Sequence, residues 1–323
     1  MIEIEQRGQA GSAPLGVVFS TSMNRPDAAF ALAAIYLAAI KRECRVGSVC
    51  VTGSGLNAAI FCDVLDRFYN GAPKNGNQAL PPGLLATTPP APDSPMVTAP
   101  VERKKDTGEA QYVRTLRKVT DTSQAEAVLR NGVIFNAESV MVLSGPAGPL
   151  AQSLNLLDVP AIYQKRVKRL VIVDAGVPQK DVAALRRIVA EWPTPIFFVG
   201  RDVGEALKFP GAKLEELFAP SPAHPLVDAY NAFKPAPYDA PLYDVAAVHY
   251  AIHPDSGFFA SSEPGSLKVG DDGGVQFVAG GGKIQRLSVD PAKQADALAA
   301  LIALVTQKPP AAPGARGRGA GAA

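Results

Sequence analysis

Short apolar runs alternate along this chain with longer stretches that carry the 3.6-residue period of helices. Five runs stand out because apolar residues dominate each of them: 16–19, 46–51, 139–143, 167–173 and 195–199. Strands buried on both faces have this composition, and strands that alternate with helices form parallel sheets. The sequence therefore predicts an α/β fold with an open, mainly parallel sheet and helices on both faces.

The C-terminal third has a different pattern. Gly-rich turns separate short strand-like runs over residues 258–287, which predicts small antiparallel hairpins, and residues 291–306 have the pattern of a closing amphipathic helix. We expect one domain over residues 1–307. Residues 71–100 are rich in proline, which fixes φ and removes a donor, and are expected to form an irregular surface excursion. Residues 308–323 have the low complexity of a disordered tail.

The charge balance argues against several classes of partner. The 323 residues carry 32 basic and 30 acidic side chains, for a net charge of +2, so no general cationic field would hold nucleic acid or an anionic membrane. The longest apolar run, 28–40, is too short to span a bilayer, and the polar N-terminus lacks the pattern of a secretory signal. The composition favours a cytoplasmic protein with a small-molecule ligand or a protein partner, and it leaves a homo-oligomer open.

The three cysteines match no zinc-binding spacing. Cys44, Cys50 and Cys62 lie in one early segment, and an odd number of cysteines is typical of a reducing compartment. Free cysteine is usually buried. We therefore expect three small side chains in the core.

A polar loop, residues 20–27, follows the first strand and leads into a strongly apolar helix. In an α/β protein such a loop lies at the carboxyl end of a strand, where ligands usually bind. The helix behind it offers backbone N–H donors and a partial positive charge. We expect a functional site here, although Asp27 also suits an ordinary helix cap and Ser20 and Ser22 suit turn formers.

Two further patterns have both a functional and a structural interpretation. Residues 53–58, GSGLNA, resemble a loose dinucleotide-binding fingerprint. The acidic residue that this fingerprint needs about twenty positions later is missing, which favours a plain strand-to-helix turn. His249 and His253 stand one helical turn apart and would be metal ligands or a wet surface pair. The sequence offers no third ligand nearby, which favours the surface pair.

Four segments together resemble the inosine-uridine preferring nucleoside hydrolase family. The opening strand, loop and helix are similar to the family's hydrophobic strand, D-x-D-P-G-x-D-D loop and Ala/Leu-rich helix. Three later segments resemble family motifs in order and spacing: LSGPAGPLAQSL (143–154), VKRLVIVDAG (167–176) and PLYDVAAVHYAIHPD (241–255). The resemblance implies an open α/β sheet with the site at the carboxyl ends of its strands, and hydrolysis of the N-glycosidic bond of ribonucleosides.

The resemblance also implies a Ca²⁺ cofactor and a set of site residues. The family holds one Ca²⁺ with carboxylates and ribose hydroxyls, so Asp27 and Asp244 are the metal-ligand candidates, and Asp27 is also the candidate catalytic base. Tyr243 replaces a family histidine and is the candidate acid for the leaving base. Five residues at strand ends are the candidate ligand-binding residues: Ser20, Ser22, Asn24, Ser144 and Asp174.

The charge of the first loop departs from the family motif. If Asp27 matches the last of the four carboxylates, the other three positions are Ser20, Ser22 and Pro26, and Arg25 adds a positive charge where a cation would sit. Two hypotheses follow. The chain is a divergent nucleoside hydrolase with weak activity on a ribosyl ligand, or it is a catalytically inactive binding or protein-interaction module on the same fold.

Overall fold

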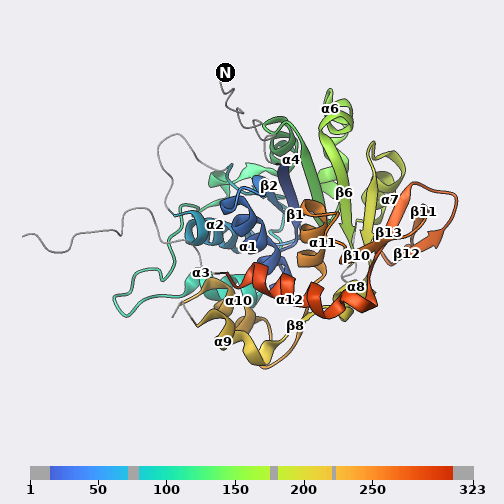
Figure 1. Ribbon diagram of the computed structural model, residues 1–323. Helices are drawn as coiled ribbons and strands as arrows, with labels where there is room; N and C mark the ends of the chain where they lie inside the picture. The colour runs from blue at the N-terminus through green and yellow to red at the C-terminus, as the bar shows by residue number, and fades with distance from the viewer. Residues whose placement is uncertain (1–14, 72–79, 175–180, 220–222, 308–323) are drawn as a thin grey trace, which may run out of the picture.

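A large sheet forms the centre of the computed structural model, which describes residues 15–71, 80–174, 181–219 and 223–307 (Figure 1). Its strands are β1 (Leu15–Thr21), β2 (Cys44–Val51), β3 (Gly83–Leu84), β4 (Ser123–Gln124), β5 (Ser139–Ser144), β6 (Val167–Val173), β7 (Ile196–Val199), β10 (Phe259–Ser261), β11 (Gly265–Val269), β12 (Val275–Ala279) and β13 (Ile284–Val289). Among the described residues, a separate small sheet pairs β8 (Lys208–Phe209) with β9 (Ala240–Pro241).

The strand order confirms the predicted α/β fold. Ten strands follow the order β12-β11-β13-β7-β6-β5-β1-β2-β3-β4, and β10 pairs with β13. The seven strands from β7 to β4 in this order are parallel to their neighbours, whereas β11 and β12 form the expected antiparallel hairpin. β13 pairs antiparallel with β10 and β11, but it differs from the prediction because it also runs parallel to β7 and so joins the hairpins to the main sheet.

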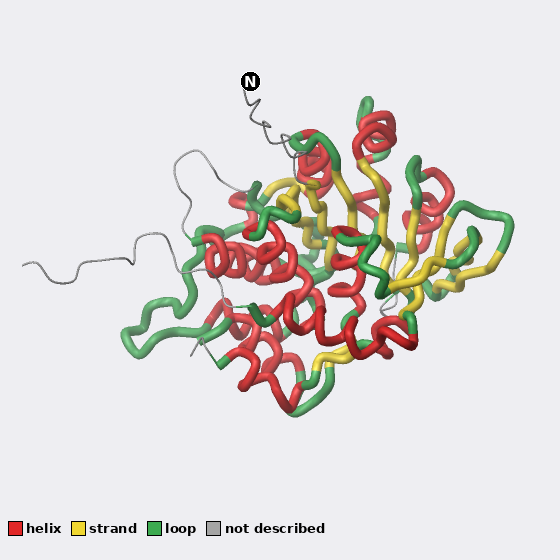
Figure 2. Tube along the Cα trace, in the orientation of Figure 1, coloured by secondary structure: helices red, strands yellow, loops and turns green. Residues whose placement is uncertain are grey.

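Helices cover both faces of this sheet (Figure 2). On one side of the sheet, buried side chains of the following helices share one core: α1 (Pro26–Ile40), α2 (Leu56–Asn70), α3 (Pro95–Glu102), α8 (Arg201–Ala206), α9 (Leu214–Phe218), α10 (Pro225–Phe233), α11 (Tyr243–Ile252) and α12 (Gln294–Val305). The other face packs against α4 (Ala125–Ile134), α5 (Gly148–Ser153), α6 (Val159–Arg166) and α7 (Val182–Glu191). Three short 3₁₀ turns, Val119–Asp121, Gly211–Lys213 and Pro291–Lys293, complete the described elements.

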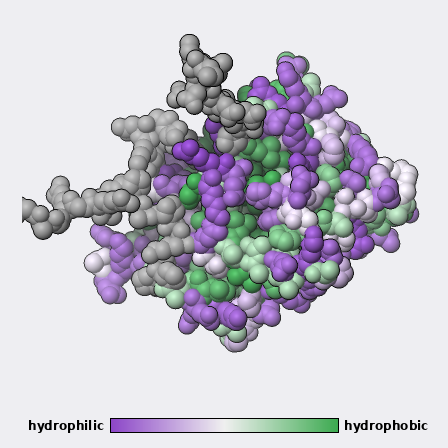
Figure 3. Space-filling view, viewed as in Figure 1, coloured by the Kyte–Doolittle hydropathy of each residue, from purple (hydrophilic) through white to green (hydrophobic). Residues whose placement is uncertain are grey.

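α1 is apolar on all sides because it lies between the sheet and other helices. Pro26 occupies the first helical position, where its missing N–H costs nothing. All residues from Pro26 to Ala38 are buried, and α1 contacts α2, α10, α11 and α12. Of the helices in the described ranges, none is long and apolar enough to cross a membrane. In Figure 3, less polar residues gather over the lower middle of the visible face, where Figure 1 shows the alanine-rich α12.

The proline-rich excursion is more regular than expected. The described part contains β3 and most of a helix, α3, which begins at Pro95 and includes Pro100. Pro95 takes the first helical position, where the N–H has no intrahelical partner, whereas Pro100 lies inside the helix and removes one intrahelical hydrogen bond. Residues 72–79 of the excursion, and the predicted disordered tail at 308–323, lie outside the described residues.

The predicted burial of the cysteines is confirmed. Cys44, Cys50 and Cys62 are all free and buried in the described core. Burial disfavours the thiolate, and it raises the pKa of the Cys44 thiol to about 12. These cysteines are therefore core side chains with little thiolate at neutral pH.

His224 caps α10, and its buried imidazole leads us to expect a lower free energy of unfolding in acid. Its Nδ1 accepts a hydrogen bond from the Leu226 N–H at 3.2 Å, and burial lowers the pKa of His224 to about 4. The unfolded chain takes up this proton below about pH 6.5, but the folded protein does not. We therefore expect His224 to reduce the free energy of unfolding by about 2 kcal/mol when the pH falls from 7 to 5.

Urea unfolding of the wild type and of His224→Asn at pH 7 and pH 5 measures this effect. Asparagine also caps helices but does not titrate, so the variant should lose about 2 kcal/mol less on acidification. The raised pKa values of the buried carboxyls Asp27 and Asp244 contribute with the opposite sign in both proteins, and they cancel in the comparison. Equal pH dependence of the two proteins would contradict the prediction.

Candidate functional site

Asp27 lies in the first turn of α1, but its carboxylate caps a different helix. Oδ2 accepts the N–H of Asp244 at 2.6 Å, and Oδ1 accepts the N–H of Val245 at 3.2 Å. These amides belong to the first turn of α11 and have no partner within that helix. The carboxylate is buried, with 2% of the residue exposed. The structural interpretation of Asp27 as a cap therefore holds, although for α11 and not for its own helix.

Asp244, also in the first turn of α11, forms a buried ion pair with Arg25. Arg25 Nη2 lies 3.3 and 3.2 Å from the two carboxylate oxygens of Asp244 and 3.4 Å from Ser144 Oγ. The Ser144 hydroxyl also donates to Asp244. Asp244 is fully buried, and Arg25 is 16% exposed. Three elements, β5, α11 and the loop before α1, thus converge at the carboxyl end of the sheet.

The two carboxyls influence each other's ionisation. Burial raises the pKa of Asp27 well above its ordinary value, and the neighbouring Asp244 charge raises it further. Arg25 and the two backbone N–H groups act in the opposite direction. Burial also raises the pKa of Asp244, while Arg25 and Ser144 favour its ionised form. Arg25 is therefore the charge that compensates this pair.

The residues present do not fit a Ca²⁺ site. Calcium takes six to eight oxygen ligands, several of them charged, but here both oxygens of Asp27 accept helix amides and both oxygens of Asp244 face a guanidinium. Within the described ranges, no group of three or more acidic, histidine or cysteine side chains has the geometry to hold a metal ion. The guanidinium of Arg25, a residue of the loop before α1, supplies the positive charge that a bound cation would otherwise supply.

A cavity of about 200 Å³ opens beside this cluster. Arg25, Pro26, Asp27 and Tyr243 contribute to its lining. The other lining residues come from the end of α10 and the segment after it: Phe233, Lys234, Tyr238, Asp239, Ala240 and Pro241. Its position at the carboxyl end of the central strand is the one expected for a ligand site in this class of fold.

Tyr243 lines the cavity, but its hydroxyl is engaged. The hydroxyl donates a hydrogen bond to Glu205 at 2.8 Å, and burial raises the pKa of Tyr243 above its ordinary value. A raised pKa weakens a proton donor near neutral pH. Glu205, which lies on α8, was not found from the sequence because nothing in α8 marks it as a partner of Tyr243.

Ser20 and Ser144 face opposite sides of the sheet. Ser20 lies two residues after Val18, which belongs to the core on the α4 side, and Ser20 Oγ has no partner among the described atoms. Ser144 is in register with Thr21 and so faces the opposite side, towards α11. The sequence predicted that both would serve one ligand, and strand alternation separates Ser20 from the Arg25 cluster.

The rest of the loop is held by its own hydrogen bonds. Ser22 Oγ donates to Asn24 Oδ1 at 2.7 Å, and the Ser22 carbonyl accepts from Ser54. Asp174 lies directly after β6, two strands from β1 in the sheet, and its N–H donates to the Val199 carbonyl at 2.9 Å. The turn that follows Asp174, residues 175–180, lies outside the described residues.

The GSGLNA segment forms the predicted strand-to-helix turn. A carboxylate accepts hydrogen bonds from the amides that would bind the phosphate of a dinucleotide. Asp93 accepts from the N–H groups of Asn57 and Ala58 at 2.9 and 3.0 Å, at the start of α2. A side chain at Gly55 would collide with Asp93, which explains the glycine. The excursion thus caps α2, and this structure disfavours the dinucleotide alternative.

The histidine pair is only half exposed. His249 is 8% exposed, its Nδ1 has no partner among the described atoms, and burial lowers its pKa to about 4. His253 Nε2 lies 3.3 Å from a carboxylate oxygen of Glu43. The centres of the His249 and His253 imidazole rings are 5.4 Å apart. The interpretation as a wet surface pair is therefore wrong for His249, which packs against Phe258 and Phe259.

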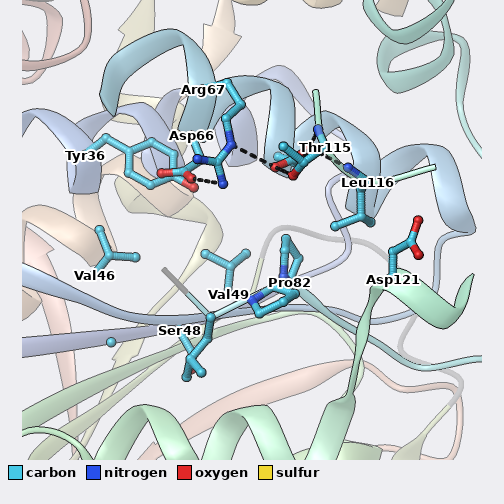
Figure 4. A pocket seen from close by; sticks show the side chains of 14 residues that line it. Tyr36, Val46, Ser48, Val49, Asp66, Arg67, Pro82, Thr115, Leu116 and Asp121 are labelled. Atoms are coloured by element: carbon cyan, nitrogen blue, oxygen red, sulfur yellow. Dashed lines mark hydrogen bonds and ion pairs between the residues drawn. The ribbon is translucent and has the colours of Figure 1, made fainter. Parts of the chain in front are cut away.

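A second cavity, of about 210 Å³, lies beside β2 and contains none of the predicted site residues (Figure 4). Its charged groups bind one another. Asp63 accepts from Arg67 Nε at 3.2 Å and from the Leu116 N–H at 2.8 Å, and Arg67 also pairs with Asp66 at 3.0 Å. These contacts fasten the segment around Thr115 to α2, which is a structural role.

The architecture is that of the nucleoside hydrolase fold. The central strand ends in a polar loop, and the first turn of a helix from the last third of the chain meets that loop. Matches to solved structures support this assignment. No family model matches the sequence, and no curated protein is similar to it at a significant level.

Several solved structures share the fold over most of their length. The inosine-uridine preferring nucleoside hydrolase from Bacillus anthracis has a TM-score of 0.61 and 14% identity, over 89% of this chain and 99% of that chain. The purine-preferring ribonucleoside hydrolase from Gardnerella vaginalis gives 0.61 and 14%, over 90% and 98%. The type III effector protein XopQ, solved with adenosine diphosphate ribose, gives 0.61 and 11%, over 92% and 94%. At these identities the likeness establishes the fold.

Proposed function

We propose that this protein is a divergent relative of the nucleoside hydrolases that binds a nucleoside or a related ribosyl compound and has little or no hydrolytic activity. The observation that carries the proposal is the engagement of both site carboxylates within the chain. Asp27 caps α11, and Asp244 is paired with Arg25. A carboxylate that already accepts two hydrogen bonds is poorly placed to activate a water.

The cavity supports binding of a small polar ligand. Its volume of about 200 Å³ is below the range typical of drug-sized ligands, and it suits one ring with its substituents. The Arg25 guanidinium lines the cavity and supplies a positive charge there. Lys234, whose Nζ lies 4.3 Å from the centre of the Tyr238 ring, supplies a second positive charge to the lining of the same cavity.

Related proteins make ribosyl compounds the first ligands to test. Two of the similar structures are named as nucleoside or ribonucleoside hydrolases, and XopQ was solved with adenosine diphosphate ribose. The same fold therefore serves both hydrolases and an effector protein. Retained activity is the competing hypothesis, because Asp27 and Tyr243 both line the cavity.

Calorimetric titration with inosine, uridine and adenosine diphosphate ribose, in the presence of a chelator, tests binding. A reducing-sugar assay on inosine and uridine with added Ca²⁺ tests hydrolysis. We expect saturable binding of at least one compound, weakened in Lys234→Ala and unchanged in the control Lys105→Ala, whose ion pair with Glu109 lies outside the cavity. We expect no release of ribose above the blank.

Two outcomes would contradict the proposal. Ribose release that depends on Ca²⁺ and disappears in Asp27→Ala would establish a hydrolase. Absence of both binding and release for all three compounds would remove ribosyl ligands as the occupants of this cavity.

A further inference from the structure

Arg25 contacts Asp244, one of the two metal-ligand candidates that the family resemblance implies, and Ser144, one of the candidate ligand-binding residues. We infer that the Arg25 guanidinium is a covalently attached replacement for a divalent cation, and that its removal uncovers a weak divalent-cation site formed by Asp244, Ser144 and Asp27. This inference concerns the cavity of the proposed function but does not depend on which ligand, if any, binds there.

The charge balance of the cluster supports this inference. Asp27 and Asp244 are 2% and 0% exposed, and two carboxylates so deeply buried need a nearby positive charge to remain ionised. In the part of the chain that the structure describes, the positive charge of Arg25 lowers the pKa of both Asp27 and Asp244. A guanidinium stays protonated at all physiological pH values, so the compensation is permanent and independent of metal supply.

The oxygen atoms around the guanidinium are held in place by elements other than the loop. Asp244 belongs to the first turn of α11, and Ser144 is the last residue of β5. Two hydrogen bonds fix Asp27 to α11. The longer one, at 3.2 Å, runs from the Val245 N–H to Oδ1 of Asp27. Substitution of Arg25 would therefore leave these oxygens close to their present positions, with room for water ligands.

The charge of this donor set predicts weak binding. A dedicated calcium site provides more ligands, both charged and neutral, than two carboxylates and one hydroxyl. We therefore expect a dissociation constant for the divalent cation on the order of 10⁻⁴ to 10⁻³ M. The side chain at position 25 would thus decide whether this fold uses a bound metal or its own cation in the cavity.

Titration with Tb³⁺, a luminescent substitute for Ca²⁺, tests the inference on the full chain. Tyr243 lines the same cavity and can sensitise a bound Tb³⁺ ion. We expect a saturable signal that Ca²⁺ displaces in Arg25→Ser. The wild type and the charge-preserving control Arg25→Lys should show no such signal. The signal should be lost in Arg25→Ser/Asp244→Asn, which lacks the main charged ligand.

Three results would overturn the inference: equal binding in the wild type and Arg25→Ser, no binding in a folded Arg25→Ser, or binding that survives the loss of Asp244. If Arg25→Ser does not fold, Arg25→Gln keeps much of the side-chain volume and adds an amide oxygen, so absence of binding in that folded variant is equally decisive. The titration contains no ribosyl compound, so its failure is distinct from failure of the proposed function.

Discussion

Replacement of Asp244 with alanine is expected to lower the free energy of unfolding by about 4 kcal/mol, within the range of 3–5 kcal/mol for breaking a buried ion pair from one side. Asp244 is fully buried, and its loss leaves the Arg25 guanidinium without its carboxylate and Ser144 without its acceptor. The loss of stability comes mainly from the Arg25 charge that remains without a partner, and not only from the lost attraction between Arg25 and Asp244. Urea unfolding at neutral pH measures it.

The exposed pair of Arg187 and Glu191 provides a matched control, because its Glu191 side chain is 54% exposed. We expect Glu191→Ala to cost less than about 1 kcal/mol. The double variant Arg25→Met/Asp244→Leu should recover much of the lost stability, because it removes both charges together. A cost for Asp244→Ala no larger than that for Glu191→Ala would show that Arg25 and Asp244 are not paired in solution.

Replacement of Asp27 with alanine is expected to lower the free energy of unfolding by about 3 kcal/mol, because two buried helix amides lose their acceptor. Both bonds, to the N–H groups of Asp244 and Val245, cross from α1 to α11. Asp27→Asn should cost less, since its amide oxygen still accepts one bond. Thermal or urea unfolding gives the stability, and hydrogen exchange of the Val245 amide reports the cap itself.

Asp290 is the appropriate control for this cap. Its carboxylate accepts from the Ala292 N–H at 3.0 Å, but the bond is exposed and local. We expect Asp290→Ala to cost about 1 kcal/mol or less. If Asp27→Ala leaves the exchange rate of Val245 unchanged, then Asp27 does not cap α11.

The elements that the sequence predicted well are those with a strong local signal. The apolar run over Val167–Val173 predicted β6 without error, and the alternation of strands and helices predicted the parallel sheet. Local composition misled where tertiary contacts decide the outcome. Dense prolines indicated irregular structure around Pro95 and Pro100, yet both fit within α3.

The sequence could indicate which segments meet but not the contacts between their side chains. The loop after β1 and the start of α11 lie together, in agreement with the pairing of Asp27 and Asp244 that the family resemblance implies. The sequence showed that Arg25 was present, but it could not show that Arg25 reaches Asp244 and Ser144, because these residues lie far apart along the chain. Glu205 and Asp93 were missed for the same reason.

The burial of α1 has a consequence for biosynthesis. α1 leaves the ribosome well before α10, α11 and α12, three of the helices that enclose it. Until they emerge, the nascent chain exposes a wholly apolar helix, which is the kind of surface that chaperones bind and that aggregates when it is left uncovered. Completion of this fold therefore requires that α10, α11 and α12 have left the ribosome.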